Sequence, residues 1–222
     1  MIISNDYVYG LEESIVASGY PMLSKPLTEE EFDKEVDSVW VDLSDSKMPR
    51  EIMLSNKHIK RAIKLAQTPS GSGHDNALKG IIVQFDCNAP QYFWQQLQRY
   101  HFIDFVSSMS KMHCITKFDN TMIADGTSYT AIKNMEYAVQ DYIAGECDID
   151  TALRNVPMGL TYTARMSTNY LQLKTIYKQR RHHRSIEWQA FCDWIEELPL
   201  AQELIIGNTF KNESHYTGEQ KE

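Results

Sequence analysis

The chain has 222 residues, of which 42% are hydrophobic and 23% charged, the composition of an ordinary globular protein with a proper core. Its formal net charge of -8 argues against general electrostatic binding to nucleic acid, which needs a basic surface. No apolar run approaches the roughly 20 residues that a membrane span needs, and no basic region followed by an apolar run opens the chain. We therefore expect one cytoplasmic domain over residues 1–222, with residues 207–222 a flexible tail.

The spacing of cysteines and histidines argues against a metal site. The cysteines at positions 87, 114, 147 and 192 are far apart and form no CxxC pair, so zinc binding is not expected. His182 and His183 are adjacent in the sequence, and adjacent side chains on a helix point in different directions. We expect no metal, and we expect reduced cysteines that act as buried hydrophobic residues.

Hydrophobic periodicity and capping signals organise the first third of the chain. Residues 1–8 are expected to form a strand, and residues 11–18 a short helix. Thr28 with Glu31 three positions later is a capping box, which opens an acidic helix to about Trp40. Pro49 begins another helical pattern to about residue 65. Residues 68–76 are either a mobile loop or a loop over a pocket, and they lack the GxxxxGK[ST] phosphate-binding pattern. Residues 80–87 then alternate as a strand.

The central stretch, residues 88–111, carries the most suggestive polar pair. Its front half reads as a helix whose first turn contains Pro90, and its apolar side chains would bury that helix deeply. Gln96 and Arg99 are three positions apart, so they would share one helix face. A buried amide and guanidinium need a partner, which is either a planar oxyanion or pyrimidine ring, or a local carboxylate such as Asp104. The spacing alone favours the local carboxylate.

The second half of the chain reads as further helices around one strand. Residues 112–118 are expected to be a short strand or irregular. Residues 130–144 have helical periodicity that Gly145 stops, and Asp148 is a good N-cap for a helix ending at residue 154. Residues 160–166, rich in threonine and tyrosine, predict a strand, and Ser167 or Thr168 would cap a helix to about residue 181. Ser185 would cap the last clear helix.

One basic cluster stands out against the acidic remainder. Residues 180–184 read Arg-Arg-His-His-Arg, and Lys174 and Lys178 lie just before them. Such a cluster can hold the phosphates of a nucleotide, a flavin or nucleic acid. The alternative is a solvated helix terminus, where cations interact favourably with the helix dipole.

Two segments resemble the flavin-dependent thymidylate synthases (the ThyX family). Residues 81–90 followed by residues 95–101 resemble the family's central segment, in which a strand leads into a helix ending in Arg-His-Arg; here the signature reads Arg99-Tyr100-His101. Residues 153–157, 161–163 and 178–180, with Asn169 between them, are similar to the family's C-terminal half. The resemblance covers roughly residues 55–199. It implies an α+β fold, with a small antiparallel sheet packed with helices, and a homotetramer whose pockets lie between subunits.

The resemblance also implies a reaction and a set of site residues. The reaction is methylation of dUMP to dTMP, with FAD, NADPH and methylene-tetrahydrofolate as cofactors. The residues that would bind dUMP are Gln96, Arg99, Lys111, Arg154 and Arg180. Those that would line the flavin are Tyr100, His101, Asn169 and Arg184. The family's catalytic serine falls on Met109, so its flanking residues, Ser108 and Ser110, are the candidates.

Three other functions remain open at this point. The first is a divergent enzyme that acts on a related pyrimidine for modified-base synthesis. The second is a nucleotide-binding relative that kept the dUMP arginines and lost the flavin. The loss of the family's second arginine, replaced here by His101, favours this last alternative over a complete flavin site. The third is a nucleic-acid-binding module that uses residues 180–184.

Overall fold

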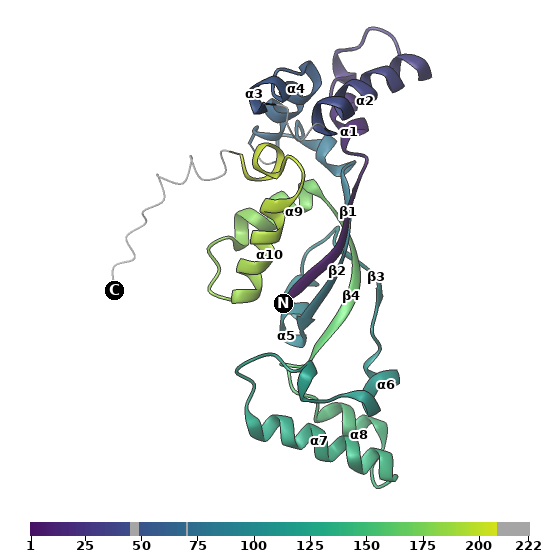
Figure 1. Ribbon diagram of the computed structural model, residues 1–222, viewed down its shortest axis with the longest axis vertical. Helices are drawn as coiled ribbons and strands as arrows, with labels where there is room; N and C mark the ends of the chain where they lie inside the picture. The colour runs from purple at the N-terminus through teal and green to yellow at the C-terminus, as the bar shows by residue number, and fades with distance from the viewer. Residues whose placement is uncertain (45–48, 70, 208–222) are drawn as a thin grey trace, which may run out of the picture. The chain divides into compact units, whose positions relative to one another are not determined.

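A computed structural model describes residues 1–44, 49–69 and 71–207 (Figure 1). The chain forms two compact units. Unit 1 joins Met1–Tyr7 to Gln84–Ser167, and unit 2 joins Val8–Val83 to the chain from Thr168 onward. A single domain over the whole chain stays a prediction, and the tail predicted from residue 207 falls, after Gly207, outside the described residues.

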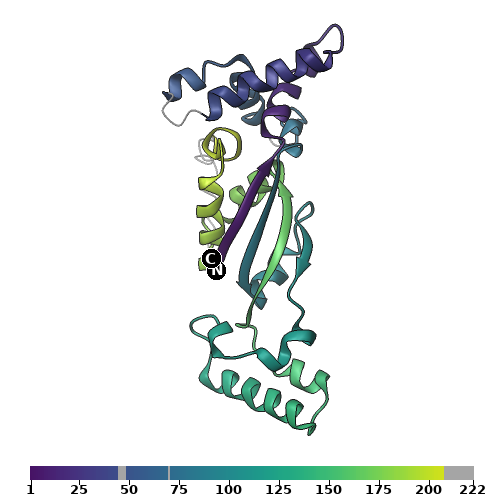
Figure 2. The same cartoon turned by 45° about the vertical axis from the view of Figure 1, so that its right-hand side comes forward.

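A four-stranded sheet holds most of unit 1 together, in the order β1-β2-β4-β3 (Figures 1 and 2). The strands are β1 (Ile2–Tyr9), β2 (Ile82–Pro90), β3 (Asp104–Ser108) and β4 (Thr161–Asn169). In β2, Val83, Phe85 and Cys87 are fully buried, whereas Gln84 and Asp86 are half-buried on the other face. This period of two is the one that predicted β2 from sequence, and the α+β class with a small antiparallel sheet is confirmed.

Unit 1 also contains a helical region with its own hydrophobic core. Its helices are α5 (Gln91–Leu97), α6 (Lys111–Cys114), α7 (Tyr129–Ala144) and α8 (Ile149–Arg154), with short 3-10 turns at Ile115–Lys117 and Asn120–Met122. The buried side chains of this core come mainly from α7 and the segments around it: Ile115, Phe118, Met135, Val139, Ala152 and Leu160. The predicted ends hold, because Gly145 leaves α7 with a φ of 76° and Asp148 accepts the Thr151 N–H at 2.7 Å.

Two local predictions in unit 1 are wrong, and one strand was missed. Residues 112–118 were expected as a strand or irregular segment, but residues 112–117 fall in α6 and the following 3-10 turn. The reason is a cap, because the Ser110 hydroxyl accepts the His113 N–H at 3.4 Å. Pro90 ends β2 with a ψ of 154° and precedes the first helical turn of α5 rather than lying in it. Strand β3 was not predicted at all.

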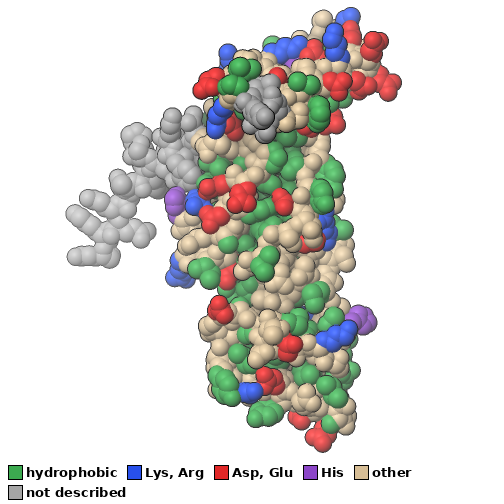
Figure 3. Space-filling view, viewed as in Figure 1, with side chains coloured by type: hydrophobic (Ala, Val, Ile, Leu, Met, Phe, Trp, Pro, Cys, Tyr) green, Lys and Arg blue, Asp and Glu red, His purple; other side chains and the backbone are tan. Residues whose placement is uncertain are grey.

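Unit 2 is helical in the parts described. It contains α1 (Leu11–Ala17), α2 (Glu29–Ser44), α3 (Arg50–Met53), α4 (Lys57–Ala66), α9 (Tyr170–Arg180) and α10 (Ile186–Glu197). Two 3-10 turns lie at Tyr20–Met22 and Asn76–Lys79, and a π-helical turn at Gln202–Ile206 was not predicted. Acidic side chains gather over α2 in the space-filling view, as expected for a solvated acidic face (Figure 3).

Helix caps in unit 2 confirm one prediction and correct two. The Thr28–Glu31 capping box forms, with the Thr28 N–H 2.9 Å from Glu31 Oε2. The helix expected from Pro49 is two helices, because Asn56 breaks the pattern and its side chain accepts the His58 N–H at 2.9 Å to start α4. Asn169, rather than Ser167 or Thr168, caps α9 by accepting the Gln172 N–H at 2.9 Å.

Two of the four cysteines have the buried position expected of them. No disulfide joins them; Cys87 and Cys192 are buried, and Cys114 and Cys147 are half-buried. Burial raises the pKa of the Cys87 thiol to about 12, so this thiol stays protonated and unreactive at neutral pH.

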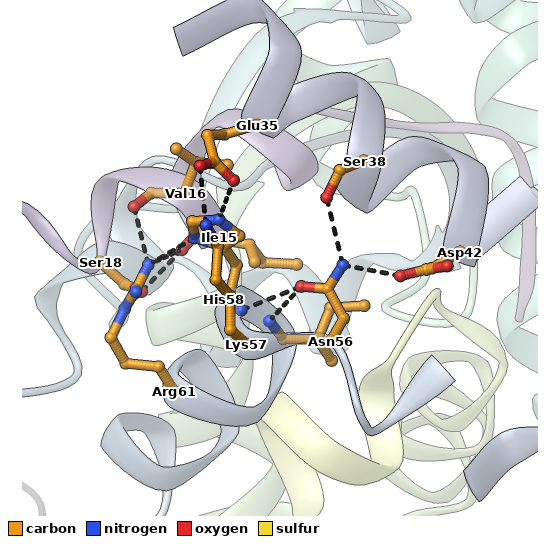
Figure 4. A network of polar contacts seen from close by, with 11 residues as sticks. Ile15, Val16, Ser18, Glu35, Ser38, Asp42, Asn56, Lys57, His58 and Arg61 are labelled. Atoms are coloured by element: carbon orange, nitrogen blue, oxygen red, sulfur yellow. Dashed lines mark hydrogen bonds and ion pairs between the residues drawn. The ribbon is translucent and has the colours of Figure 1, made fainter. Parts of the chain in front are cut away.

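A polar network clasps α1, α2 and α4 together (Figure 4). The Arg61 guanidinium donates to His58 Nδ1 at 2.9 Å and to three acceptors at the end of α1, namely Ser18 Oγ and the carbonyls of Ile15 and Val16. Because arginine only donates, His58 Nδ1 must accept. The other ring nitrogen therefore carries the proton and donates to Glu35 on α2 at 2.6 Å. Lys57 completes the clasp by donating to the second Glu35 oxygen at 2.7 Å.

The Glu35 carboxylate of this polar network makes the stability of the protein depend on pH. The hydrogen bond from Lys57, and after it the one from His58, lower the folded-state pKa of Glu35 below the usual value for a glutamate. A depressed carboxylate pKa contributes stability that is complete above the unfolded pKa and is lost as pH falls through the folded pKa. We therefore expect Glu35→Gln to unfold about 0.5–1 kcal/mol more easily than the wild type at pH 7, with the difference shrinking below about pH 4. Urea unfolding of both proteins between pH 3 and 7 measures it, and a difference that persists unchanged at pH 3 would contradict this cause.

Candidate functional site

Helix α5 ends two residues before the signature that the sequence placed on it. Phe93, Trp94 and Leu97 are buried, so this seven-residue helix is anchored along its apolar side. It stops at Leu97, and Arg99 lies in the turn that follows. The expectation that Gln96 and Arg99 share a helix face is therefore wrong. The chain leaves the turn through Phe102, whose φ of 58° redirects it into β3.

The signature residues differ in how the fold uses them. Arg99 and His101 are exposed, and within the described residues neither side chain has a hydrogen-bond or ion-pair partner. The local pairing of Arg99 with Asp104 does not form. Gln96 and Tyr100 are half-buried and make contacts within the fold. Arg99 thus presents a charged fork that the fold itself does not use, which suits an anion or a carbonyl oxygen.

Lys111 is tied back to α5 across twenty residues of sequence. Its Nζ donates to Gln91 Oε1 at 2.9 Å and lies 5.9 Å from the centroid of the Tyr162 ring. Tyr162 in turn stacks on the buried Trp94, with ring centroids 5.3 Å apart and planes at 28°. We call Lys111, Gln91, Tyr162 and Trp94 the Lys111 cluster. It holds a half-buried ammonium beside the segment that carries the serine candidates.

The two candidate serines have different environments. Ser108 ends β3 opposite Ala164 of β4 and is exposed. Ser110 is half-buried, and its hydroxyl accepts the cap hydrogen bond of α6. Between them, the Met109 N–H donates to the Thr163 carbonyl at 3.0 Å, which fixes the backbone of this segment against β4. Ser108 is consequently the candidate whose hydroxyl the fold leaves unused among the described residues.

The remaining candidate of unit 1 is Arg154, the last residue of α8. Its side chain is exposed, and it forms no ion pair with any residue that the structure describes. Its charge is the smallest of the favourable influences that lower the pKa of Asp148, after the hydrogen bonds from Thr151. A basic residue at a helix C-terminus also interacts favourably with the helix dipole, so a structural role accounts for this position as well.

The basic cluster of unit 2 is largely committed to packing. The Arg180 guanidinium lies 4.6 Å from the Trp188 ring centroid, in a cation–π contact. Arg181 pairs with Asp193 at 2.5 Å, and His183 Nδ1 accepts the Ser185 N–H at 3.1 Å. Arg184 is exposed and has no ion-pair partner among the described residues. Contacts within unit 2 therefore account for Arg180, Arg181 and His183 of this cluster.

The structure brings some predicted residues together and separates others within each unit. In unit 1, the end of α5 and the turn after it carry Gln96, Arg99, Tyr100 and His101. Lys111 is joined to the start of that helix through Gln91. In unit 2, Asn169 caps the start of α9 and Arg180 ends it, so roughly 16 Å of helix separates them. Sequence reasoning missed Gln91 and Tyr162. The signal for Gln91 was its place directly after Pro90, at the first position of a helix.

The described residues contain neither a cluster of metal-binding side chains nor a membrane-spanning helix. In residues 1–44, 49–69 and 71–207, no three histidine, cysteine, aspartate or glutamate side chains gather as a metal ion would require. Over the same ranges, every helix is too short or too polar to cross a lipid bilayer.

The side chains assigned to the flavin are donors that suit it. The Asn169 carbonyl oxygen is used as a helix cap, whereas its amide nitrogen donates to no described residue. His101 and Arg184 are exposed and have no partner in the described parts of the chain. An amide N–H, an imidazole and a guanidinium match the carbonyl and phosphate oxygens of a flavin dinucleotide. The residues present therefore fit this cofactor in chemistry.

Comparison with known proteins gives a fold and no close relative. No protein-family model matches the chain, and no curated protein matches it. Two solved structures of the flavin-dependent thymidylate synthase ThyX from Helicobacter pylori, each with FAD and dUMP, are similar to it, at TM-scores of 0.62 and 0.66 and 12% identity. They cover 92% and 95% of this chain, and 98% and 100% of their own.

A third similar structure is the UMP/dUMP methylase PolB from Streptomyces cacaoi, bound with 5-Br dUMP. Its TM-score is 0.55 at 12% identity, and the match covers 92% of this chain and 95% of that one. At such identity these likenesses show the fold alone. The chain therefore has the fold of the flavin-dependent thymidylate synthases, as the sequence resemblance predicted.

Proposed function

We propose that the chain is a divergent flavin-dependent thymidylate synthase, which methylates dUMP to dTMP with methylene-tetrahydrofolate and a reduced flavin. The observation that carries this proposal is the fold shared along more than nine-tenths of the chain with structures that hold dUMP or its 5-bromo analogue. It is supported by the unused guanidinium of Arg99 and by the ammonium of the Lys111 cluster.

In this proposal the chain supplies positioning and charge. Arginine forks and a lysine hold the nucleotide's phosphate and carbonyl oxygens, from Gln96, Arg99, Lys111, Arg154 and Arg180. Ser108 and Ser110 lie near the uracil ring. The flavin, held by Tyr100, His101, Asn169 and Arg184, supplies the hydride, and NADPH reduces it. The protein works in the cytoplasm as a homotetramer whose subunits share each site.

A second function belongs to the same fold. A dUMP-binding protein without flavin is favoured by one observation, which is that His101 stands where the family has an arginine. A methylase acting on a related pyrimidine nucleotide is the other variant of the proposal, and the similar UMP/dUMP methylase supports it.

A spectrum of the purified protein followed by a dUMP titration tests these functions. We expect absorbance at about 450 nm, which is typical of oxidised flavin. We also expect dUMP to raise the melting temperature, because a ligand that binds only the folded state stabilises it by about 2.7 kcal/mol at 100 times its Kd. A colourless protein that dUMP still stabilises would replace the enzyme by the flavin-free nucleotide binder. Stabilisation by UMP and not by dUMP would change the substrate, and stabilisation by neither would contradict the proposal.

A further inference from the structure

The ammonium of Lys111 is held at two points by side chains that are themselves anchored. Gln91 accepts from it, and the Gln91 backbone N–H donates to the Leu160 carbonyl at 3.0 Å, while its side-chain amide donates to Met158 Sδ at 3.6 Å. Tyr162 presents its ring to the ammonium and stacks on Trp94. The Trp94 indole N–H is fixed in turn by the Ala89 carbonyl at 3.0 Å. A long and flexible side chain is thus held by partners that are tied to the core of unit 1.

Neither of these two contacts neutralises the charge. Gln91 is an uncharged acceptor, and the ring face attracts the cation through its quadrupole. Across the described residues, no carboxylate forms an ion pair with Lys111. An ammonium has three N–H donors and Gln91 takes one, so donors remain for a ligand. A half-buried, oriented and unneutralised lysine suits an anion, because part of its rotamer entropy is already lost before binding.

We propose that Gln91 and Tyr162 are positioning residues, which fix the Lys111 ammonium as the group that binds the phosphate monoester of the nucleotide. The inference rests on the proposed function in one respect, that the phosphate belongs to a pyrimidine nucleotide. Lysine binds phosphate as a point charge, whereas arginine binds it through a rigid fork. An arginine fork is oriented by its own planar geometry. The Lys111 ammonium is instead oriented by its contacts with Gln91 and Tyr162.

Calorimetric titration of two ligands tests the inference. The ligands are dUMP and deoxyuridine, which differ only in the phosphate, and the readout is the ratio of their affinities. We expect Lys111→Met to lower dUMP affinity about 10- to 100-fold, from the loss of a hydrogen bond to a charged group, and deoxyuridine affinity less than about twofold. Gln91→Ala should lower dUMP affinity about 3- to 10-fold with the same selectivity for the phosphate.

Matched variants separate positioning from folding. Gln91→Glu places a carboxylate against the ammonium and should weaken dUMP binding more than Gln91→Ala, although it keeps the size of the side chain. Tyr162→Leu removes the ring face beside the ammonium and should lower phosphate selectivity. Gln95→Ala, at an exposed position of the same helix, is the control and should change nothing.

The outcomes for this inference and for the proposed function are distinguishable. Equal wild-type affinity for dUMP and deoxyuridine, or equal losses for both ligands in Lys111→Met, would overturn the inference and leave pyrimidine binding intact. Binding of inorganic phosphate that Lys111→Met abolishes and Gln91→Ala weakens, in a protein that does not bind dUMP, would support the inference and contradict the proposed function. Unchanged selectivity in Gln91→Glu would remove Gln91 from the site.

Discussion

Arg99→Ala is expected to bind dUMP about 10- to 150-fold more weakly than the wild-type chain while melting at the same temperature. A hydrogen bond to a charged group is worth about 1.5–3 kcal/mol, which corresponds to that range of affinity. The melting temperature should not move, because Arg99 is exposed and none of the described residues pairs with its side chain. Calorimetry gives the affinity and thermal unfolding without ligand gives the stability.

Two neighbouring substitutions sharpen the measurement of Arg99. Arg99→Lys keeps the charge and loses the fork, so it should recover part of the affinity. Gln98→Ala removes the exposed residue next to it and should bind as tightly as the wild type. Arg180→Ala is a poorer test, since it also removes the cation–π contact with Trp188. Equal dUMP affinity for Arg99→Ala and wild type would exclude Arg99 from the nucleotide site.

Elements defined by neighbours in the sequence could be predicted. The Thr28–Glu31 capping box, the Asp148 cap and the Gly145 stop each depend on residues within a few positions of one another. Strand β2 could be predicted because one of its faces is buried and the other is not, so apolar and polar residues alternate along it. These signals are local, so they survive without any knowledge of tertiary contacts.

Strand β3 lacked such a signal for a physical reason. It lies at the edge of the sheet, Val106 is exposed, and its register shifts between Phe105 and Ser107. A bulged edge strand has neither a fully buried face nor regular alternation, so the sequence carries no period of two there. The break between α3 and α4 also lacks a signal in the pattern of apolar residues. Apolar residues continue on both sides of Asn56, and only its cap hydrogen bond ends the helical pattern.

The residues of the candidate site also differ in whether the local sequence could reveal them. The sequence could name Arg99 as a charge of interest, but its position beyond α5 depends on where that helix ends. The contact between Lys111 and Gln91 joins two helices, and the one between Lys111 and Tyr162 joins a helix to a strand fifty residues further on. No periodicity reveals such pairs. Lys174, which the sequence grouped with the basic cluster, is for the same reason assigned by its tertiary contacts to the core of unit 2.

Lys174→Met is expected to destabilise the protein by about 3–5 kcal/mol, the cost of leaving one partner of a buried ion pair alone. Lys174 Nζ lies 2.8 Å from Asp75 Oδ2 and 2.5 Å from the Ala66 carbonyl, and the two charged side chains are only 12% and 5% exposed. The lysine thereby ties α9 to the end of α4 and to the chain that leads into β2. For a protein of this size the melting temperature should fall by about 6–20 °C.

The partners of Lys174 supply the controls. Asp75→Asn should destabilise by a comparable amount, whereas Asp75→Leu combined with Lys174→Met should cost less than the two single changes together, because neither charge is then left buried alone. Asp193→Ala breaks the more exposed pair with Arg181, at 29% and 61% exposure, and should cost no more than about 1 kcal/mol. If Lys174→Met instead kept its stability and lost affinity for dUMP, Lys174 would belong to the phosphate-binding cluster that the sequence first indicated, and its ion pair with Asp75 would contribute little to the fold.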